Sequence, residues 1–211
     1  MIRAFTAEPL APGTADRLLT AASRAPSAGF SQGYSFLALE GAEQSAPFWR
    51  LLYAQAAAAG AAADDEAAQV DALSPAPLVL VPMASKDVYL DRYAEPDKAG
   101  LGLERAENWR VPFWLVDTSF ATMAMLLAAT DAGLGALFFG LGGGESALRD
   151  HLGVPPGYDP IGAVSLGWPA GHDAPSPSLA RGRRVRSEVV HYGRWSPSGG
   201  PPAPAPPDPA P

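Results

Sequence analysis

The chain has 211 residues, a formal net charge of −7 and no cysteine. Its length fits a single domain with a sizeable core. The acidic balance excludes the broad basic surface that duplex nucleic acid requires, although a basic run stands out at 181–186. The lack of cysteine excludes disulfides, thiolate catalysis and zinc–thiolate sites. The three histidines show no ligand spacing, so we expect no metal site.

The patterns in the first half of the chain alternate between helix and strand. A helix is expected from Thr14, which would cap it, to about Ala25, and Pro26 and Gly29 end it. Three further elements are expected: an alternating strand over 34–40, a helix over 44–59 that continues as an exposed helix or loop to 68, and a buried strand over 77–82, between two prolines.

The second half centres on one long apolar helix. Residues 85–110 predict a short helix and an irregular loop, the kind of segment that covers a pocket. The helix itself runs from about Phe113, behind Pro112, to Ala132, and Gly133 stops it. The helix is apolar nearly all round, but its apolar run at 113–129 is shorter than a membrane span and is interrupted by polar residues. We therefore expect the helix to be central in the protein or at an interface. Beyond it we expect a strand over 134–139, a loop over 140–144, a helix over 145–152 and a strand over 161–168.

Helices and strands interleave without the regular rhythm of a doubly wound fold, which favours an α+β fold with a sheet flanked by helices. The last residues, 196–211, are rich in proline and predict a disordered tail, so the folded domain is expected over 1–195. The N-terminus has no basic segment followed by an apolar stretch, which predicts a cytoplasmic protein without a signal peptide.

Two segments carry possible chemistry. The turn over 25–36, rich in Pro, Ser and Gly, lets the backbone approach a flat ligand, with Ser27 and Gln32 supplying hydrogen bonds; an ordinary helix-to-strand turn is the alternative. The glycines at 140–144 lie between a strand and a helix and suit a phosphate, but Glu145 opposes an anion there, so a flexible connector is the stronger interpretation.

Five blocks, in order, resemble the nitroreductase family. The turn resembles the family signature through Pro26, Ser27, Gln32 and the aromatic Tyr34. The later blocks are the long central helix with its exit at 117–135, a helix end at 148–155, a strand end at 165–169, and the C-terminal arm at 183–190 followed by Trp195.

The resemblance implies a homodimer with a mixed sheet, the long apolar helix at the dimer interface, and two FMN sites shared between the subunits. Arginines of the two arms would bind the flavin phosphate, and the turn and the end of a strand would line the rest. The cofactor-binding residues so implied are Arg3, Pro26, Ser27, Gly29, Gln32, Phe139, Gly140, Arg183 and Arg184. Hydrides would pass from NADH or NADPH to a nitroaromatic or quinone acceptor by ping-pong exchange, without a named catalytic side chain.

Five aromatic residues are candidates to shape the acceptor slot, with core or lid packing as the alternative. They are Phe30, Tyr89, Tyr93, Trp109 and Trp114.

Three departures from the family pattern keep other functions open. A motif of two arginines and a serine is missing before Arg3, Phe30 replaces the common Asn, and Gly33 replaces the common Pro. The missing motif removes a phosphate contact and predicts weaker FMN binding, by about one to two decades. The alternatives are a non-catalytic flavin-binding or scaffold protein on the same fold, another flavin chemistry such as dehalogenation, flavin cleavage or azoline oxidation, and an unrelated α/β enzyme.

Overall fold

The computed structural model describes residues 1–58, 63–142, 145–171 and 176–195. The chain divides into two compact units, Met1–Ala174 and Pro175–Pro211. The expected tail at 196–211 lies outside the described residues.

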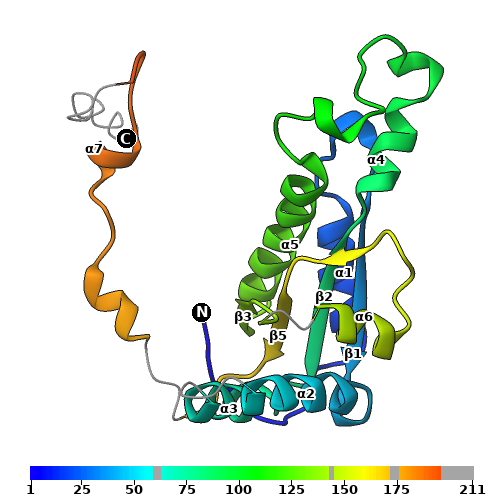
Figure 1. Cartoon of the computed structure of the whole chain (residues 1–211). Coiled ribbons are helices and arrows are strands. Elements are labelled where there is room, and N and C mark those ends of the chain that lie inside the picture. The colour runs from blue at the N-terminus through cyan, green and yellow to red at the C-terminus, as the bar shows by residue number, and fades with distance from the viewer. Residues whose placement is uncertain (59–62, 143–144, 172–175, 196–211) are drawn as a thin grey trace. The chain divides into compact units, whose positions relative to one another are not determined.

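An antiparallel sheet forms the centre of the first unit (Figure 1). In spatial order it contains β1 (Tyr34–Glu40), β2 (Leu78–Ala84), β5 (Ala163–Gly167) and β3 (Gly135–Phe139), and the short β4 (Asp159–Pro160) pairs with β2. The α+β class is confirmed, but every pair of described strands is antiparallel, so the expected mixed sheet is wrong. The reason is the connectivity. Two helices return the chain from β1 to the same end of the sheet for β2, and β5 lies between β2 and β3, the two strands that run in the same direction.

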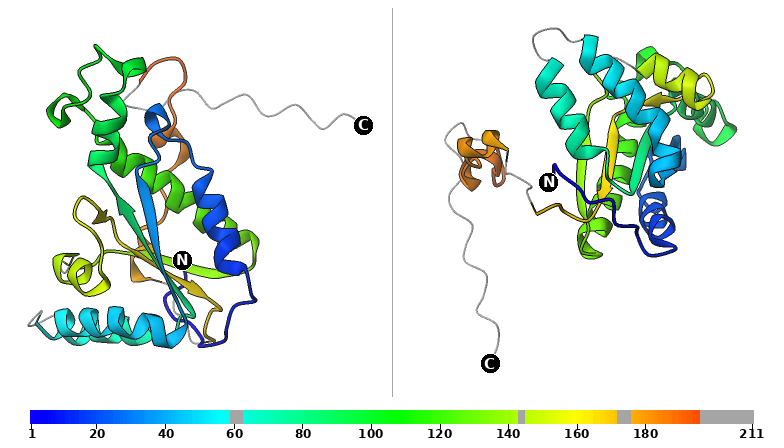
Figure 2. Two further views of the ribbon diagram at one scale, coloured as in Figure 1. Left: turned by 90° about the vertical axis from the view of Figure 1, so that its right-hand side faces the viewer. Right: turned by 90° about the horizontal axis from the view of Figure 1, so that it is seen from below.

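The two faces of the sheet bury separate cores, because successive side chains of a strand point to opposite faces. Leu78 and Leu80 of β2 pack with α1 (Thr14–Ser23) and α5 (Phe113–Asp131). Val79 and Val81 pack on the other side. That side is covered by α2 (Gly41–Ala58), α3 (Ala63–Leu73) and α6 (Glu145–Leu152). Figures 1 and 2 show α1 beside α5, and α2 beside α3.

The long helix α5 begins after Pro112 and is followed by Gly133 with φ 75°, as the sequence predicts. Among the described residues it is the one helix long and apolar enough to cross a membrane, a test that the core helix of a soluble protein also passes. One side of α5 is buried in the core around Met125, while Phe120 and Leu127 on another side are exposed.

The remaining segments flank these layers. The N-terminal arm runs along the end of the sheet: the Ile2 amide donates to the Ala136 carbonyl at 3.1 Å, and Phe5 forms a bridge with Pro169. After β2 the chain forms α4 (Lys86–Tyr93) and the 3-10 turns η3 (Pro96–Lys98) and η4 (Ala106–Asn108) before it enters α5. Within the second unit lie η5 (Pro177–Arg181) and α7 (Arg186–Val189).

Three of the predicted boundaries that differ in the structure have a local explanation. Thr14 does not cap α1: Gly13 holds the N-cap position, Thr14 is already helical, and its hydroxyl accepts a bond from the Arg17 guanidinium. The second helix begins at Gly41 because the Gln44 side chain accepts from the Glu40 amide and closes the first turn early. Strand β2 continues through its proline, which lies beyond the stretch that pairs with β5, so its missing N–H removes no bond to that strand.

Candidate functional site

The turn that precedes β1 is closed by its own polar groups. The Phe30 amide donates to the Ser27 carbonyl at 2.9 Å, and the Gln32 amide donates to the Ser27 hydroxyl oxygen at 3.0 Å. The Ser31 hydroxyl donates to the Ala28 carbonyl at 2.7 Å. Since the Ser27 oxygen accepts in this arrangement, its own proton stays available to a ligand.

A buried carboxylate fastens the turn to the long helix. One oxygen of Asp117, on α5, accepts from the Ala28 amide and from the Tyr89 hydroxyl, each at 2.7 Å. Asp117 is 2% exposed and Tyr89 is fully buried. Burial, followed by the bond to Asp117, raises the pKa of the Tyr89 hydroxyl. Burial and the charge of Asp117 also raise the pKa of Tyr34, whose hydroxyl donates to the Ser23 carbonyl.

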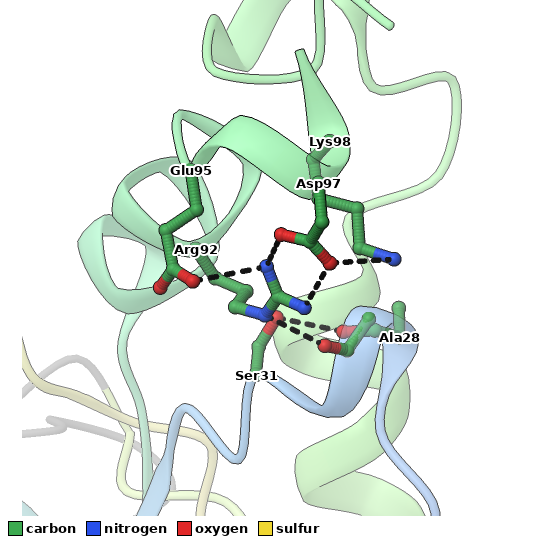
Figure 3. A network of polar contacts seen from close by, with 7 residues as sticks. Ala28, Ser31, Arg92, Glu95, Asp97 and Lys98 are labelled. Atoms are coloured by element: carbon green, nitrogen blue, oxygen red, sulfur yellow. Dashed lines mark hydrogen bonds and ion pairs between the residues drawn. The ribbon is translucent and has the colours of Figure 1, made fainter.

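A guanidinium fastens the turn from a third side (Figure 3). Nε of Arg92, on α4, donates to the Gly29 carbonyl at 2.9 Å. Its other two nitrogens donate to the two carboxylate oxygens of Asp97, both at 2.7 Å, and one of them also contacts Glu95 at 3.2 Å. The bond from Arg92 lowers the pKa of the Asp97 carboxyl to about 2, so this ion pair is fully charged near neutral pH.

Two glycines of the turn accommodate tyrosine rings. A Cβ on Gly29 would lie 2.8 Å from the Tyr93 ring, and a Cβ on Gly33 would lie 2.5 Å from the Tyr89 ring and 2.9 Å from the Ser85 carbonyl oxygen. Any other residue at position 33 would therefore place its Cβ where the Tyr89 ring lies. The turn and α4 form one packed unit.

Two residues of the turn that are not glycine adopt left-handed backbone conformations. Phe30 has φ 56° and Gln32 has φ 53°, and these are the only such residues among those described. A bulky residue in this region costs on the order of 1–3 kcal/mol. Phe30 is also 75% exposed, so core packing does not compensate for that cost.

The other four predicted aromatic residues form a single cluster. The Trp109 ring lies 4.8 Å from Tyr93, 5.9 Å from Trp114 and 6.0 Å from Tyr89, measured between ring centroids. Its indole N–H donates to the Leu103 carbonyl at 2.6 Å. The cluster joins α4, the loop between α4 and α5, and the start of α5. Tyr89 is buried within this cluster, so its ring supports the turn. For all four rings, a role in lining the acceptor slot stays a prediction.

The residues predicted to bind the cofactor come from separate segments of the chain. Pro26, Ser27, Gly29 and Gln32 lie together in the turn, as predicted. Phe139 ends β3 with its ring stacked 6.2 Å from Trp49, and a Cβ on Gly140 would meet no described atom within 4 Å.

The predicted phosphate-binding arginines belong to other segments of the chain. Arg3 follows Ile2 at the start of β3, at the opposite end of the sheet from the turn. Arg183 and Arg184 are exposed residues of the second unit, where Arg184 donates to the Glu188 carbonyl at 2.6 Å.

Sequence reasoning did not identify Asp117 or Arg92 as residues of the site. A lone Asp inside an otherwise apolar helix is a signal for the first, since a buried charge requires partners. No comparable signal distinguishes Arg92 among the charges around it.

A single antiparallel sheet between two helical layers, with a tightly held glycine-containing turn before its first strand, defines the class of α+β protein to which the chain belongs. The model of the nitroreductase family matches residues 1–168. NfrA1 of B. megaterium superposes with a TM-score of 0.66 at 23% identity, covering 93% of this chain and 71% of that one. The NfrA1 nitroreductase of B. subtilis gives 0.65 at 22% identity, covering 92% and 71%. A nitroreductase family protein of Clostridium difficile gives 0.60 at 18% identity, covering 92% and 93%.

The chain belongs to the nitroreductase family, and it is an oxidoreductase by that membership. Members of this family generally use flavin cofactors.

Proposed function

We propose that the protein is a cytoplasmic, homodimeric FMN-dependent oxidoreductase that passes hydrides from NADH or NADPH to a small organic acceptor of the nitroaromatic or quinone type. The observation that carries this proposal is the turn before β1. It offers a short glycine-containing backbone, a free hydroxyl proton on Ser27 and an exposed aromatic ring on Phe30. Such a surface fits one edge and one face of a flat heteroaromatic ring.

The residues of the chain fit FMN chemically. When bound, FMN supplies the reversible acceptance and release of a hydride. The turn would orient it through Ser27 and the backbone of Gly29, and the open space at Gly140 would admit it beside β3. Guanidinium groups of Arg3, Arg183 and Arg184 would bind its phosphate, since a planar guanidinium matches phosphate oxygens in pairs. Ping-pong exchange follows if donor and acceptor bind in turn in the same slot.

The positions of Arg3 and the turn within one chain support a site shared by two copies. Arg3 adjoins the end of the sheet where Leu78 pairs with Leu166, and the turn adjoins the end where Tyr34 pairs with Ala84. Six residues along β2 correspond to about 20 Å, and the three strand spacings from β1 to β3 add about 14 Å across the sheet. One small molecule does not span both distances, so a second copy would supply one of the two contacts.

The exposed side of α5 supports a second copy as well. Its large apolar side chains recur at the spacing of a helix–helix seam, and they are 37–63% exposed: Phe113, Phe120, Met123 and Leu127. A continuous apolar stripe of this kind is typical of an interface between proteins. Light scattering tests this interface. The wild type should have twice the mass of the 21.8 kDa chain, and Phe120→Glu should shift it toward monomer. Leu101→Glu, at a similarly exposed site outside α5, should not. A monomeric wild type would count against the shared site.

Flavin binding is tested by titration. We expect purified protein to bind FMN, and NADPH to bleach the bound flavin under nitrogen. Arg183→Ala should weaken FMN binding by about tenfold or more, as expected for loss of a charged hydrogen bond. Arg181→Ala, also in the second unit, is the matched control. Equal affinities of the two variants would refute the phosphate assignment.

The second candidate is a flavin-binding or scaffold protein without catalytic activity. It is favoured by the departures of the turn from the family pattern, since Phe30 replaces the common Asn and Gly33 replaces the common Pro. If the protein binds FMN but NADH and NADPH do not bleach the bound flavin, it is a flavin-binding protein without this activity. If it does not bind FMN, it is a scaffold.

A further inference from the structure

A single arginine links the turn to the segment that follows α4. Arg92 donates to the Gly29 carbonyl with Nε while its two terminal nitrogens bind both oxygens of Asp97 (Figure 3). The Arg92 side chain is mostly shielded from solvent, and two further charges complete the network: Glu95 contacts Arg92, and Lys98 contacts Asp97. The ion pair thus fixes the guanidinium in the orientation that meets the turn.

Only an arginine can make this set of bonds. The guanidinium is planar and carries five N–H donors in a fixed geometry, so one side chain serves a carboxylate with two nitrogens and a carbonyl with the third. A lysine ammonium has a single nitrogen on a flexible stem and does not reproduce this geometry.

The carbonyl that Arg92 binds controls where Phe30 lies. Gly29 has φ 61° and directly precedes Phe30, so rotation about the Gly29 backbone would move the Phe30 ring. The Tyr93 ring closes one side of Gly29, and the Arg92 bond restrains its carbonyl. Among the described residues no other ring stacks on Phe30, which is 75% exposed in a strained conformation. Ring packing therefore does not hold Phe30, and the position of its ring depends on the backbone of the turn.

We propose that Arg92, oriented by Asp97, is a positioning residue that fixes Phe30 as one wall of the acceptor slot, so that the slot prefers flat aromatic acceptors. This proposal rests on the proposed function for the slot, but the restraint of the turn by Arg92 is a property of the chain alone. A flat ring gains from contact with an immobilised aromatic face, whereas a compact inorganic oxidant gains nothing from it.

Hydrogen exchange tests the restraint on flavin-free protein. The peptide that contains Ala28 to Gln32 should exchange about tenfold faster in Arg92→Met and by an intermediate factor in Arg92→Lys. Asp97→Asn removes only the ion pair and should also accelerate exchange, so the test survives if Arg92→Met does not fold. Arg149→Met is the matched control, because it removes the 2.6 Å ion pair to Asp159 between α6 and β4. Equal exchange of this peptide in the Asp97 and Arg149 variants would overturn the proposal.

Acceptor kinetics test the preference. A bicyclic quinone, which takes two electrons and two protons to become a quinol, is compared with ferricyanide, which takes one electron without needing the slot. We expect Arg92→Lys to raise the KM for the quinone about tenfold at little change in kcat, and to leave ferricyanide reduction within twofold. A parallel fall for both acceptors would overturn the preference and leave the oxidoreductase function intact. A wild type that reduces neither with NADH or NADPH would instead refute the proposed function, and the exchange data would still decide whether Arg92 restrains the turn.

Discussion

The hydroxyl of Tyr89 donates a 2.7 Å hydrogen bond to the carboxylate of Asp117, and both residues are buried. The same carboxylate oxygen accepts from the Ala28 amide. One buried carboxylate therefore joins α4, α5 and the turn. Asp117 takes part in none of the ion pairs among the described residues, so hydrogen bonds alone stabilise its charge there.

Removing the Tyr89 hydroxyl should destabilise the protein. Tyr89→Phe keeps the ring packing and leaves a buried carboxylate with one donor fewer, which costs about 1.5–3 kcal/mol. Tyr53→Phe is the matched control, because Tyr53 donates to Asp71 at 2.5 Å on the surface, where water replaces the lost bond. Urea denaturation should show a loss for the control below about 1 kcal/mol. Equal losses would contradict the view that burial makes the Tyr89 bond costly to break.

Alkaline solutions should weaken the fold through the same tyrosine. Its pKa is raised in the folded state, so the unfolded chain releases this proton first as the pH rises above about 10. The stabilisation is complete below that pH and is lost progressively above it, by at most about 1.4 kcal/mol per pH unit. Denaturation of the wild type and of Tyr89→Phe between pH 9 and 11 measures the effect. A variant whose stability falls as steeply as that of the wild type would exclude Tyr89 as the source.

Relieving the backbone strain at Phe30 should stabilise the protein. Asn tolerates the left-handed region better than Phe, and the exposed ring contributes little burial, so Phe30→Asn should add about 0.5–1 kcal/mol to the free energy of unfolding. Leu101→Asn is the control: Leu101 is also exposed, at 58%, but is absent from the residues with positive φ. If both variants are neutral, the strain at Phe30 is smaller than its φ indicates.

Adding a single methyl group at Gly33 should disrupt the contact between the turn and α4. In Gly33→Ala the Cβ would lie 2.5 Å from the Tyr89 ring and 2.9 Å from a backbone oxygen, so a loss of about 1–3 kcal/mol is expected from overpacking. Gly171→Ala, where a Cβ meets no described atom within 4 Å, should be nearly neutral. Thermal unfolding of both variants gives the comparison, and a tolerated Gly33→Ala would show that the Tyr89 ring can move.

Periodicity predicted most of the fold. The strand over 34–40 and the helix over 145–152 have the predicted limits, and α5 ends within one residue of its prediction. These elements have regular apolar patterns and clear end signals. Thr14 failed as a cap because a glycine outside the pattern starts the helix. The strand directions failed because they depend on which strands become neighbours, a long-range property that no local pattern records.

The sequence predicted the turn of the candidate site but not the contacts that hold it, and the binding roles of its residues stay predictions. Pro26, Ser27 and Gln32 lie together in the turn because they are within seven residues of one another along the chain. The contacts that hold the turn, from Asp117 and Arg92, join residues 89 and 63 positions apart respectively, so only the folded structure brings them together. The position of Arg3 at the far end of the sheet depends on tertiary structure for the same reason.

The strand order also bears on how the protein folds. β1 and β2 are joined by a helical hairpin and can pair as soon as residue 84 has left the ribosome, whereas β5, synthesised later, must enter between β2 and β3. Until it does, both of those strands have an unpaired edge that can bind a neighbouring nascent chain. A chain terminated before residue 163 would keep these edges open, so premature termination there should give aggregates in place of a smaller folded protein.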